Sequence, residues 1–385
     1  MIIYILSFGF SALLLFLADN EHLKEKAKRD LTNSTSVILV LLALIIPCLL
    51  AGVRDVGIGT DTKGYGIWLF ELAHDSNDLA SFMESALFDK RRMEPLFALE
   101  AYFSAVLMPN STFLYFALVQ ASILVPVYFG IRILSNRCST WYPMLIFYFV
   151  FYPFSLNAMR QMIAAAFLFL GFALLIKKKK QVAWWLLFLT AIGFHRTALI
   201  GVLIYIIWFM VEKRKSFIFS LKRIFFITCA LCILVALFAD PVLSVLSKLF
   251  PVYATYYNGR DTWGNRVFVA PLFFYSLLIV LLSIGSSACR GERKRDLYFV
   301  ILVAATSMPV QLLSSVSEPI GRMMWYFFIF VLAIPAINSR SEFAKSRLGL
   351  NPICVLLLCL VQFWWFYALN GGSEIIPFSS SLLGL

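Results

Sequence analysis

The stretch NAMRQMIAAAFLFLGFALLI, residues 157–176, decides the fold class, because it is almost wholly apolar yet carries Arg160 near its beginning. A run of this length is enough for one helix across the hydrocarbon core of a bilayer. A cation in such a helix costs about 2.5–3.5 kcal/mol at its centre and less near an end, so it is rarely without a role. The stretch therefore predicts a membrane helix with a functional cation at one end.

Comparable runs recur along the whole chain of 385 residues, which is 61% hydrophobic and only 14% charged. A soluble protein of this length needs more charge to cover its surface. The runs are continuous rather than alternating, so helices and not barrel strands are predicted. We expect one all-α, polytopic membrane domain over residues 1–385, with about 12–14 transmembrane helices. The apolar runs lie at 1–18, 35–53, 94–108, 112–134, 140–155, 157–176, 182–195, 197–211, 224–239, 267–288, 297–316, 320–337 and 352–369.

Cleavage, disulfides, metals and nucleic acid are not expected. The first run ends at Ala18 without a basic leader or a small-residue cleavage site, which predicts a retained helix. The seven cysteines lie in apolar runs or beside basic clusters, and no Cys/His/Asp set has metal-ligand spacing. The net charge of +12 comes largely from basic clusters between the runs, which is the pattern of a membrane protein rather than of a nucleic-acid binder.

The basic clusters predict the topology, because short basic loops stay in the cytoplasm. They lie at 24–29, 132–137, 177–180, 213–223, 290–295 and 340–347. Residues 54–93 and 240–266 are then expected as loops on the outer side. The path from 54–93 to the cluster at 132–137 needs an odd number of crossings but holds two apolar runs. One of the runs 94–108, 112–134 and 140–155 is therefore expected to be re-entrant or half-length, with 94–108 the first candidate; the alternative is that the first loop lies on the other side.

Four arginines interrupt or end apolar runs on the expected outer side: Arg54, Arg160, Arg196 and Arg322. Guanidinium groups bind phosphate oxygens through paired hydrogen bonds. This placement predicts a site for phosphate or another polyanion.

Two further residues are candidates for acid–base chemistry. Glu94 precedes Pro95 at the expected start of a helix, so it is either a helix cap, a partner that orients Arg160, or a base. His195 lies beside Arg196 on the same expected side, and it is either a buried hydrogen-bonding residue or a catalytic one.

Within 54–93, the segments 69–73 and 79–83 are expected as short amphipathic helices on the membrane surface.

Aromatic, amide and cationic residues gather near Asn258, and such side chains stack on sugar rings and bond hydroxyl groups. The residues predicted to bind sugar are Tyr65, Gln161, Tyr256, Tyr257 and Arg266. An ordinary amphipathic loop is the alternative for the last three.

Four elements together resemble the EpsG-like branch of the Wzy-type polysaccharide polymerases. They are Arg54 with Gly59-Thr60-Asp61 and Tyr65, then Glu94-Pro95-Leu96-Phe97, then Asn157-x-x-Arg160-Gln161, then Phe194-His195-x-Thr197. The resemblance is good over residues 50–200 and rests elsewhere on helix number and on Gly321-Arg322. The chain departs from the family in carrying Arg196 where a small residue is commoner.

The resemblance implies an enzyme of the bacterial inner membrane, similar in fold to multi-helix lipid-linked glycosyltransferases (GT-C-like). Such enzymes join undecaprenyl-pyrophosphate-linked repeat units into O-antigen or exopolysaccharide on the periplasmic side, without a nucleotide sugar, a metal or another cofactor. Membrane lipids, and a flippase and a chain-length regulator of the same pathway, are the implied partners.

Transfer from a pyrophosphate needs stabilisation of the negative charge on the leaving group and a base for the acceptor hydroxyl. We predict that Arg54, Arg160, Arg196 and Arg322 bind the pyrophosphate and that His195 is the base, with Glu94 and Asp61 as alternatives. Three other functions remain open at this stage: a glycosyltransferase using a polyprenyl-phosphate monosaccharide, a flippase of lipid-linked oligosaccharide, and a membrane acyltransferase.

Overall fold

The computed structural model describes residues 1–28, 34–88, 92–135, 139–178, 180–213, 220–249, 269–284, 289, 291–315, 317–338 and 351–385. The regular elements of these residues are all helices, and none of the described residues forms a strand. The chain divides into two compact units. Unit 1 consists mainly of Met1–Leu199 and Cys359–Leu385, and unit 2 mainly of Ile200–Asn338.

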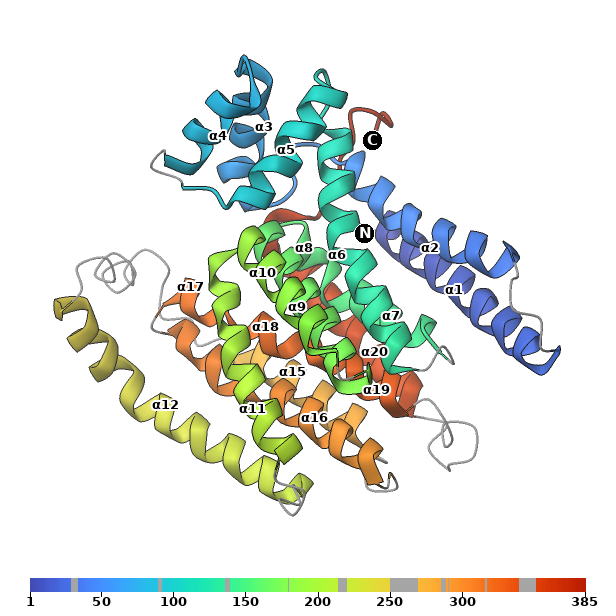
Figure 1. The fold of residues 1–385 in the computed structure, drawn as a ribbon, viewed down its shortest axis with the longest axis vertical. Helices are drawn as coiled ribbons and strands as arrows, with labels where there is room; N and C mark the ends of the chain where they lie inside the picture. The colour runs from blue at the N-terminus through green and yellow to red at the C-terminus, as the bar shows by residue number, and fades with distance from the viewer. Residues whose placement is uncertain are drawn as a thin grey trace. The chain divides into compact units, whose positions relative to one another are not determined.

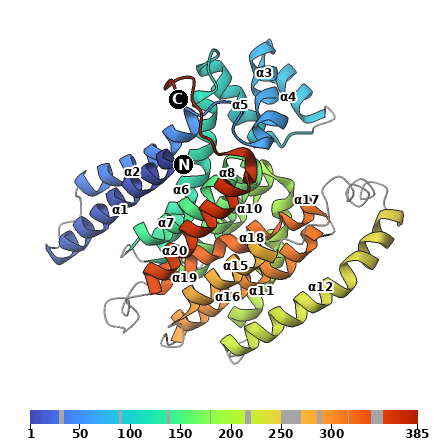
Figure 2. The ribbon, with the colours of Figure 1, turned by 180° about the vertical axis from the view of Figure 1, so that it is seen from behind.

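Unit 1 is built from long apolar helices with shorter ones between them. In it, α9 packs against both α6 and α10, and α1 packs against α2 (Figures 1 and 2). Its elements from the first part of the chain are α1 (Ile2–Lys28), α2 (Ser34–Gly52), the π-helical turn η1 (Thr62–Gly66), α3 (Ile67–Asp75), α4 (Leu79–Phe88), α5 (Pro95–Leu107), α6 (Phe113–Leu134), α7 (Trp141–Val150), α8 (Tyr152–Ser155), α9 (Met159–Lys178), α10 (Gln181–Phe194) and the 3-10 turn η2 (Arg196–Ile200).

A proline inside α2 ties three helices together. Pro47 has no N–H, so the carbonyl of Ala43, four residues earlier, loses its helical partner. The hydroxyl of Ser11 on α1 donates to that carbonyl at 2.6 Å, and the hydroxyl of Tyr152 on α8 donates to the Pro47 carbonyl at 2.7 Å. An unpaired carbonyl is costly in lipid, so the Ser11 bond compensates for the partner that Ala43 lost. The two bonds together link α1 and α8 to α2.

The segment between α2 and α6 contains the short helices that the sequence predicts. The expected helices at 69–73 and 79–83 are confirmed as α3 and α4. The run at 94–108 forms α5, whose 13 residues rise about 20 Å and fall short of a 30 Å hydrocarbon core. The helix of the next run, at 140–155, is also short, because α7 has 10 residues and ends at Val150 before α8 begins.

Unit 2 holds the helices that follow η2. The expected crossing at 320–337 is a succession of short helical segments rather than one regular α-helix. The elements are α11 (Gly201–Lys213), α12 (Leu221–Leu249), α15 (Val269–Ser283), α16 (Gly291–Leu312), η4 (Leu313–Ser315), α17 (Glu318–Gly321), α18 (Met324–Phe328), η5 (Ile329–Leu332) and α19 (Ala333–Asn338). The last helix of the chain, α20 (Asn351–Phe363), contributes to both units and continues into η6 (Trp364–Leu369) and η7 (Gly372–Glu374).

One predicted loop boundary is wrong. Residues 240–249 were expected to open an outer loop, but they continue α12, which runs for 29 residues with Pro241 inside it. The Asp240-Pro241 pair favours a helix end, yet the apolar residues after it keep the helical pattern. The rest of the expected loop, 250–266, lies outside the described residues.

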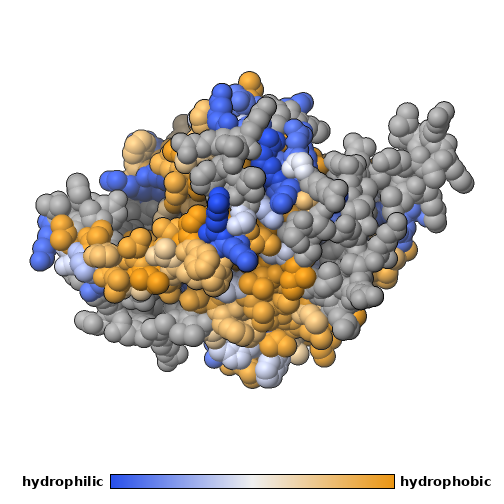
Figure 3. Space-filling model, turned by 90° about the horizontal axis from the view of Figure 1, so that it is seen from below, coloured by the Kyte–Doolittle hydropathy of each residue, from blue (hydrophilic) through white to orange (hydrophobic). Residues whose placement is uncertain are grey.

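Seven helices in the described part of the chain are long and apolar enough to cross a membrane, which makes this a multi-pass membrane protein. Broad apolar areas cover the described surface of the face in Figure 3, as expected for helices that contact lipid. The candidate spans are Ile2–Glu21, Thr35–Gly52, Phe113–Leu134, Met159–Lys177, Leu221–Val242, Pro319–Asn338 and Pro352–Leu369.

Residues 374–381 form a strap over the segment that follows α2, and both belong to unit 1. The carboxylate of Asp55 accepts from the Ser381 amide at 2.7 Å and from its hydroxyl at 2.8 Å. The Asp55 amide donates to the Ser379 carbonyl at 3.0 Å. Lys63 pairs with Glu374 at 2.8 Å. These bonds hold the backbone of the segment that contains Arg54 and Tyr65.

Candidate active site

Glu94 is the centre of a cluster that joins three helices of unit 1. Its carboxylate is 4% exposed, and Oε2 accepts from Arg160 Nη1 at 2.6 Å. Its other oxygen, Oε1, lies 2.9 Å from His195 Nδ1 and accepts from the Arg196 amide at 3.3 Å. The start of α5, the start of α9 and the end of α10 therefore meet at one carboxylate. The structure thus brings together Glu94, Arg160, His195 and Arg196 from the predicted set.

The local sequence explains why these side chains converge. Pro95 forces the residue before it into an extended conformation, and Glu94 has φ −78° and ψ 146° as the N-cap of α5. At the other helix, His195 is extended and ends α10. A Cβ on Gly193 would lie 2.7 Å from Leu96, so glycine lets the end of α10 approach the start of α5.

The protonation of the cluster follows from its partners. Burial opposes the ionised form of Glu94, but the hydrogen bond from His195 and the charge of Arg160 outweigh it and lower the pKa of the carboxyl to about 2. A carboxylate only accepts hydrogen bonds, so the proton of a neutral His195 resides on Nδ1. Its Nε2 then keeps a lone pair. Since the His195 side chain is 23% exposed, a ligand has access to it.

Arg160 is held between the carboxylate and an aromatic ring. Its guanidinium lies 4.2 Å from the centre of the Tyr65 ring, and that ring in turn meets Phe97 edge-on at 5.9 Å. Burial raises the pKa of Tyr65 to about 12, so its phenol is neutral. Its ring lies against Arg160 here, and its predicted contact with sugar stays a prediction.

Asn157 connects the turn before α9 to the segment after α2. Its Oδ1 accepts from the Thr60 hydroxyl at 2.7 Å and from the Asp61 amide at 2.8 Å. Beside it, Leu156 offers its carbonyl to Arg54 Nη1 at 2.9 Å and to the Thr62 hydroxyl at 3.3 Å. Sequence reasoning singled out Asn157 only as part of a motif and assigned it no role.

Arg54 does not occupy the position expected of a phosphate ligand. It is 4% exposed, its guanidinium lies 4.4 Å from the centre of the Phe116 ring, and its donors reach the main chain of the turn before α9. Burial lowers the pKa of Arg54 to about 10. This geometry ties Arg54 to the turn before α9, and its predicted contact with pyrophosphate stays a prediction.

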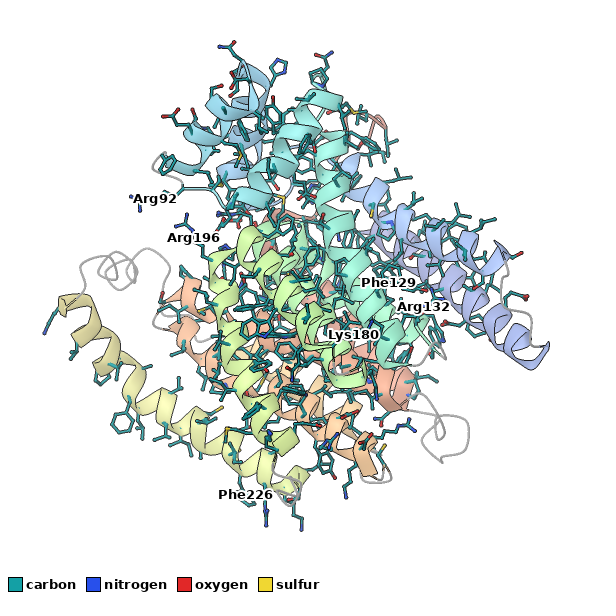
Figure 4. All side chains as sticks on the ribbon, viewed as in Figure 1. Arg92, Phe129, Arg132, Lys180, Arg196 and Phe226 are labelled. Carbon is teal, nitrogen blue, oxygen red and sulfur yellow. The ribbon has the colours of Figure 1, made fainter. Side chains whose placement is uncertain are left out.

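The remaining predicted residues differ in exposure. Arg196 is exposed at the edge of the cluster (Figure 4). Gln161 is 7% exposed behind Arg160, and Asp61 is half-buried at the start of η1. Their roles in sugar binding and catalysis stay predictions.

Four predicted residues are not in the described part of unit 1. Arg322 belongs to unit 2, in the turn between α17 and α18. Tyr256, Tyr257 and Arg266 lie outside the described residues. The sequence did not predict the contact of the strap residues Ser379–Ser381 with the segment after α2. A serine run far from the motifs is typical of an ordinary loop.

No group of three or more His, Cys, Asp or Glu side chains that could hold a metal ion exists among the described residues. The cations already present can bind phosphate oxygens. Metal independence stays a prediction.

The sequence of the chain matches one known family. The family model for EpsG matches residues 37–380, so the chain belongs to the EpsG family. This membership indicates an enzyme that polymerises polysaccharide repeat units, within a multi-pass membrane protein. A search of curated proteins and a search of solved structures gave no match.

Proposed function

We propose that the protein joins undecaprenyl-pyrophosphate-linked oligosaccharide repeat units into O-antigen or exopolysaccharide at the periplasmic face of the inner membrane. The observation that carries the proposal is the Glu94 carboxylate bonded to both His195 and Arg160 in a chain of the EpsG family. A histidine oriented by a buried carboxylate is an arrangement suited to removing a proton from a hydroxyl.

In the proposed reaction, His195 Nε2 takes the proton of the acceptor hydroxyl as its oxygen attacks the anomeric carbon of the donor. The bond between that carbon and the pyrophosphate oxygen breaks, and undecaprenyl pyrophosphate leaves with the electron pair. Attack from the face opposite the leaving group inverts the anomeric centre. The carboxylate of Glu94 stabilises the imidazolium that forms and holds its ring in place.

Charge on the leaving group is the second requirement. A pyrophosphate gains negative charge as the glycosidic bond breaks, and arginines placed to meet it lower the barrier. Arg196 is the predicted arginine that is exposed beside His195. The reaction as proposed needs neither a nucleotide sugar nor a metal.

The deciding experiment uses the purified full-length protein and a defined lipid-linked repeat unit. We expect a ladder of products that differ by whole repeat units, with release of undecaprenyl pyrophosphate. Addition of single sugars from a polyprenyl phosphate would instead indicate the monosaccharide transferase. Unchanged substrate would contradict the proposal.

The side of the membrane has its own test. Ala80, exposed on α4, is expected outside, and Lys180, exposed at the start of α10, is expected inside. In a background without the native cysteines, Ala80→Cys should react with an impermeant maleimide in cells with a permeable outer membrane. Lys180→Cys should react only after lysis. The reverse pattern would place the cluster on the cytoplasmic side.

A further inference from the structure

The cluster around Glu94 has two exposed cations at its edge. Arg196 follows His195, and its amide donates to Glu94 Oε1. Arg92 precedes Glu94 by two positions and is also exposed. Figure 4 labels both side chains, which extend on the same side of unit 1, away from the helices. Among the described residues, neither arginine forms an ion pair.

The arginines deeper in the unit have other partners. Arg160 uses Nη1 for Glu94, and the Tyr65 ring lies against its guanidinium. Arg54 is buried and bonded to the main chain. Arg92 and Arg196 are the more exposed cations of these four arginines.

The backbone at Arg92 supports a specific placement. Its φ of 42° lies in the left-handed region, which disfavours side chains other than glycine. Such a conformation persists where the neighbouring structure holds it. Here Met93 is 2% exposed and its amide donates to the Ala86 carbonyl at 2.9 Å, while Glu94 is fixed by the cluster. Anchors on the C-terminal side thus hold Arg92 at the edge of the site.

We propose that Arg92 and Arg196 together bind the pyrophosphate diester of the lipid-linked substrate. The inference rests on the proposed function for the identity of the ligand and adds Arg92 to its site. Guanidinium groups suit this role because each offers two parallel donors to phosphate oxygens.

The test measures binding separately from turnover. Full-length protein in nanodiscs of neutral phosphatidylcholine is titrated with undecaprenyl pyrophosphate, undecaprenyl monophosphate and undecaprenol. We expect the pyrophosphate to bind most tightly. Arg92→Ala and Arg196→Ala should each weaken its binding about tenfold or more, since each removes a charge-assisted contact. Binding of undecaprenol should not change.

Three variants serve as controls. Arg92→Gly removes the guanidinium but suits the left-handed backbone, so it should lose pyrophosphate binding as Arg92→Ala does. Normal binding by Arg92→Gly would mean that the alanine variant acts through the backbone. That result would overturn the role of Arg92. Lys180→Ala removes an exposed cation at the opposite end of α10 and should bind normally; an equal loss in this variant would mean that only total charge matters. Arg196→Lys should retain part of the affinity.

Bulk lipid is the other source of phosphate. Discs with added phosphatidylglycerol distinguish it, because a headgroup site would make the arginine variants differ from wild type only when anionic lipid is present. That outcome would overturn the proposal. Normal ladders together with unchanged pyrophosphate binding in both alanine variants would refute this inference and leave the polymerase intact. If wild type makes no ladder but both alanine variants lose pyrophosphate binding, the polymerase function is refuted and the anion site is kept.

Discussion

The substitution Glu94→Gln tests the catalytic cluster most directly, because it removes one charge and keeps the shape of the side chain. The amide of the introduced glutamine should turn its oxygen toward Arg160 and its NH₂ toward His195 Nδ1. His195 would then accept at Nδ1 and carry its proton on Nε2, where no lone pair is left for the acceptor hydroxyl. The variant should therefore keep its fold and lose its base.

The magnitude follows from the contacts that change. A positioned base contributes about 10²–10⁴-fold to rate, so kcat should fall by that factor. Arg160 would keep a hydrogen bond but lose a charged partner at 2.6 Å, which costs about 1.5–3 kcal/mol of stability for a buried pair. The 18% exposure of the Arg160 side chain places the value at the lower end, since solvent screens the lost charge.

The assay is single-turnover polymerisation with saturating lipid-linked repeat unit, with thermal unfolding in detergent measured in parallel. His195→Ala and the double variant complete the cycle. Because both residues serve one proton transfer, the double variant should be no slower than the slower single variant. A kcat for Glu94→Gln within a few-fold of wild type would refute the orienting role of Glu94, and additive losses would mean that the two residues act independently.

Three further outcomes are expected. His195→Gln should retain donor binding and lose turnover, since glutamine forms hydrogen bonds but takes no proton; near-normal turnover would make His195 a structural residue. Gly59→Ala should destabilise the protein by about 2 kcal/mol or more, because Gly59 has φ 90° and a Cβ would lie 2.7 Å from the Leu156 carbonyl oxygen; an unchanged melting temperature would contradict this. Since the folded pKa of Glu94 is about 2 against an ordinary 4.5, its ion pair with Arg160 stabilises the protein fully above pH 4.5 and is lost as pH falls toward 2; the difference in melting temperature between wild type and Glu94→Gln should shrink as pH falls from 4.5 toward 2.

Removal of divalent metal ions should not change the polymerisation activity. Polymerisation by purified protein should continue in EDTA, because arginines are expected to carry the phosphate charge. Activity that disappears in EDTA and returns with Mg²⁺ would contradict this expectation.

Much of the helical layout was predictable, because lipid demands continuous apolar runs and leaves few other solutions. The cluster was predictable in part: Glu94, Arg160 and His195 each stood out as a polar residue at the end of an apolar run. The burial of Arg54 was not predictable. An arginine after an apolar run has the same sequence pattern whether it is buried and bonded to carbonyls or exposed to a ligand. The end of α12 was misjudged because Asp240-Pro241 resembles a helix stop.

The strap has a consequence for the order in which the protein is made. Ser381 lies 326 positions after Asp55, its partner. At about 5–20 residues per second, a ribosome needs roughly 15–65 s to make that interval. During this time the segment that carries Arg54 and Tyr65 lacks the bonds that fix it, although α2 before it has already been synthesised. The segment that carries Arg54 and Tyr65 therefore gains these bonds only after residues 374–381 have been made, and chains halted before the strap lack them.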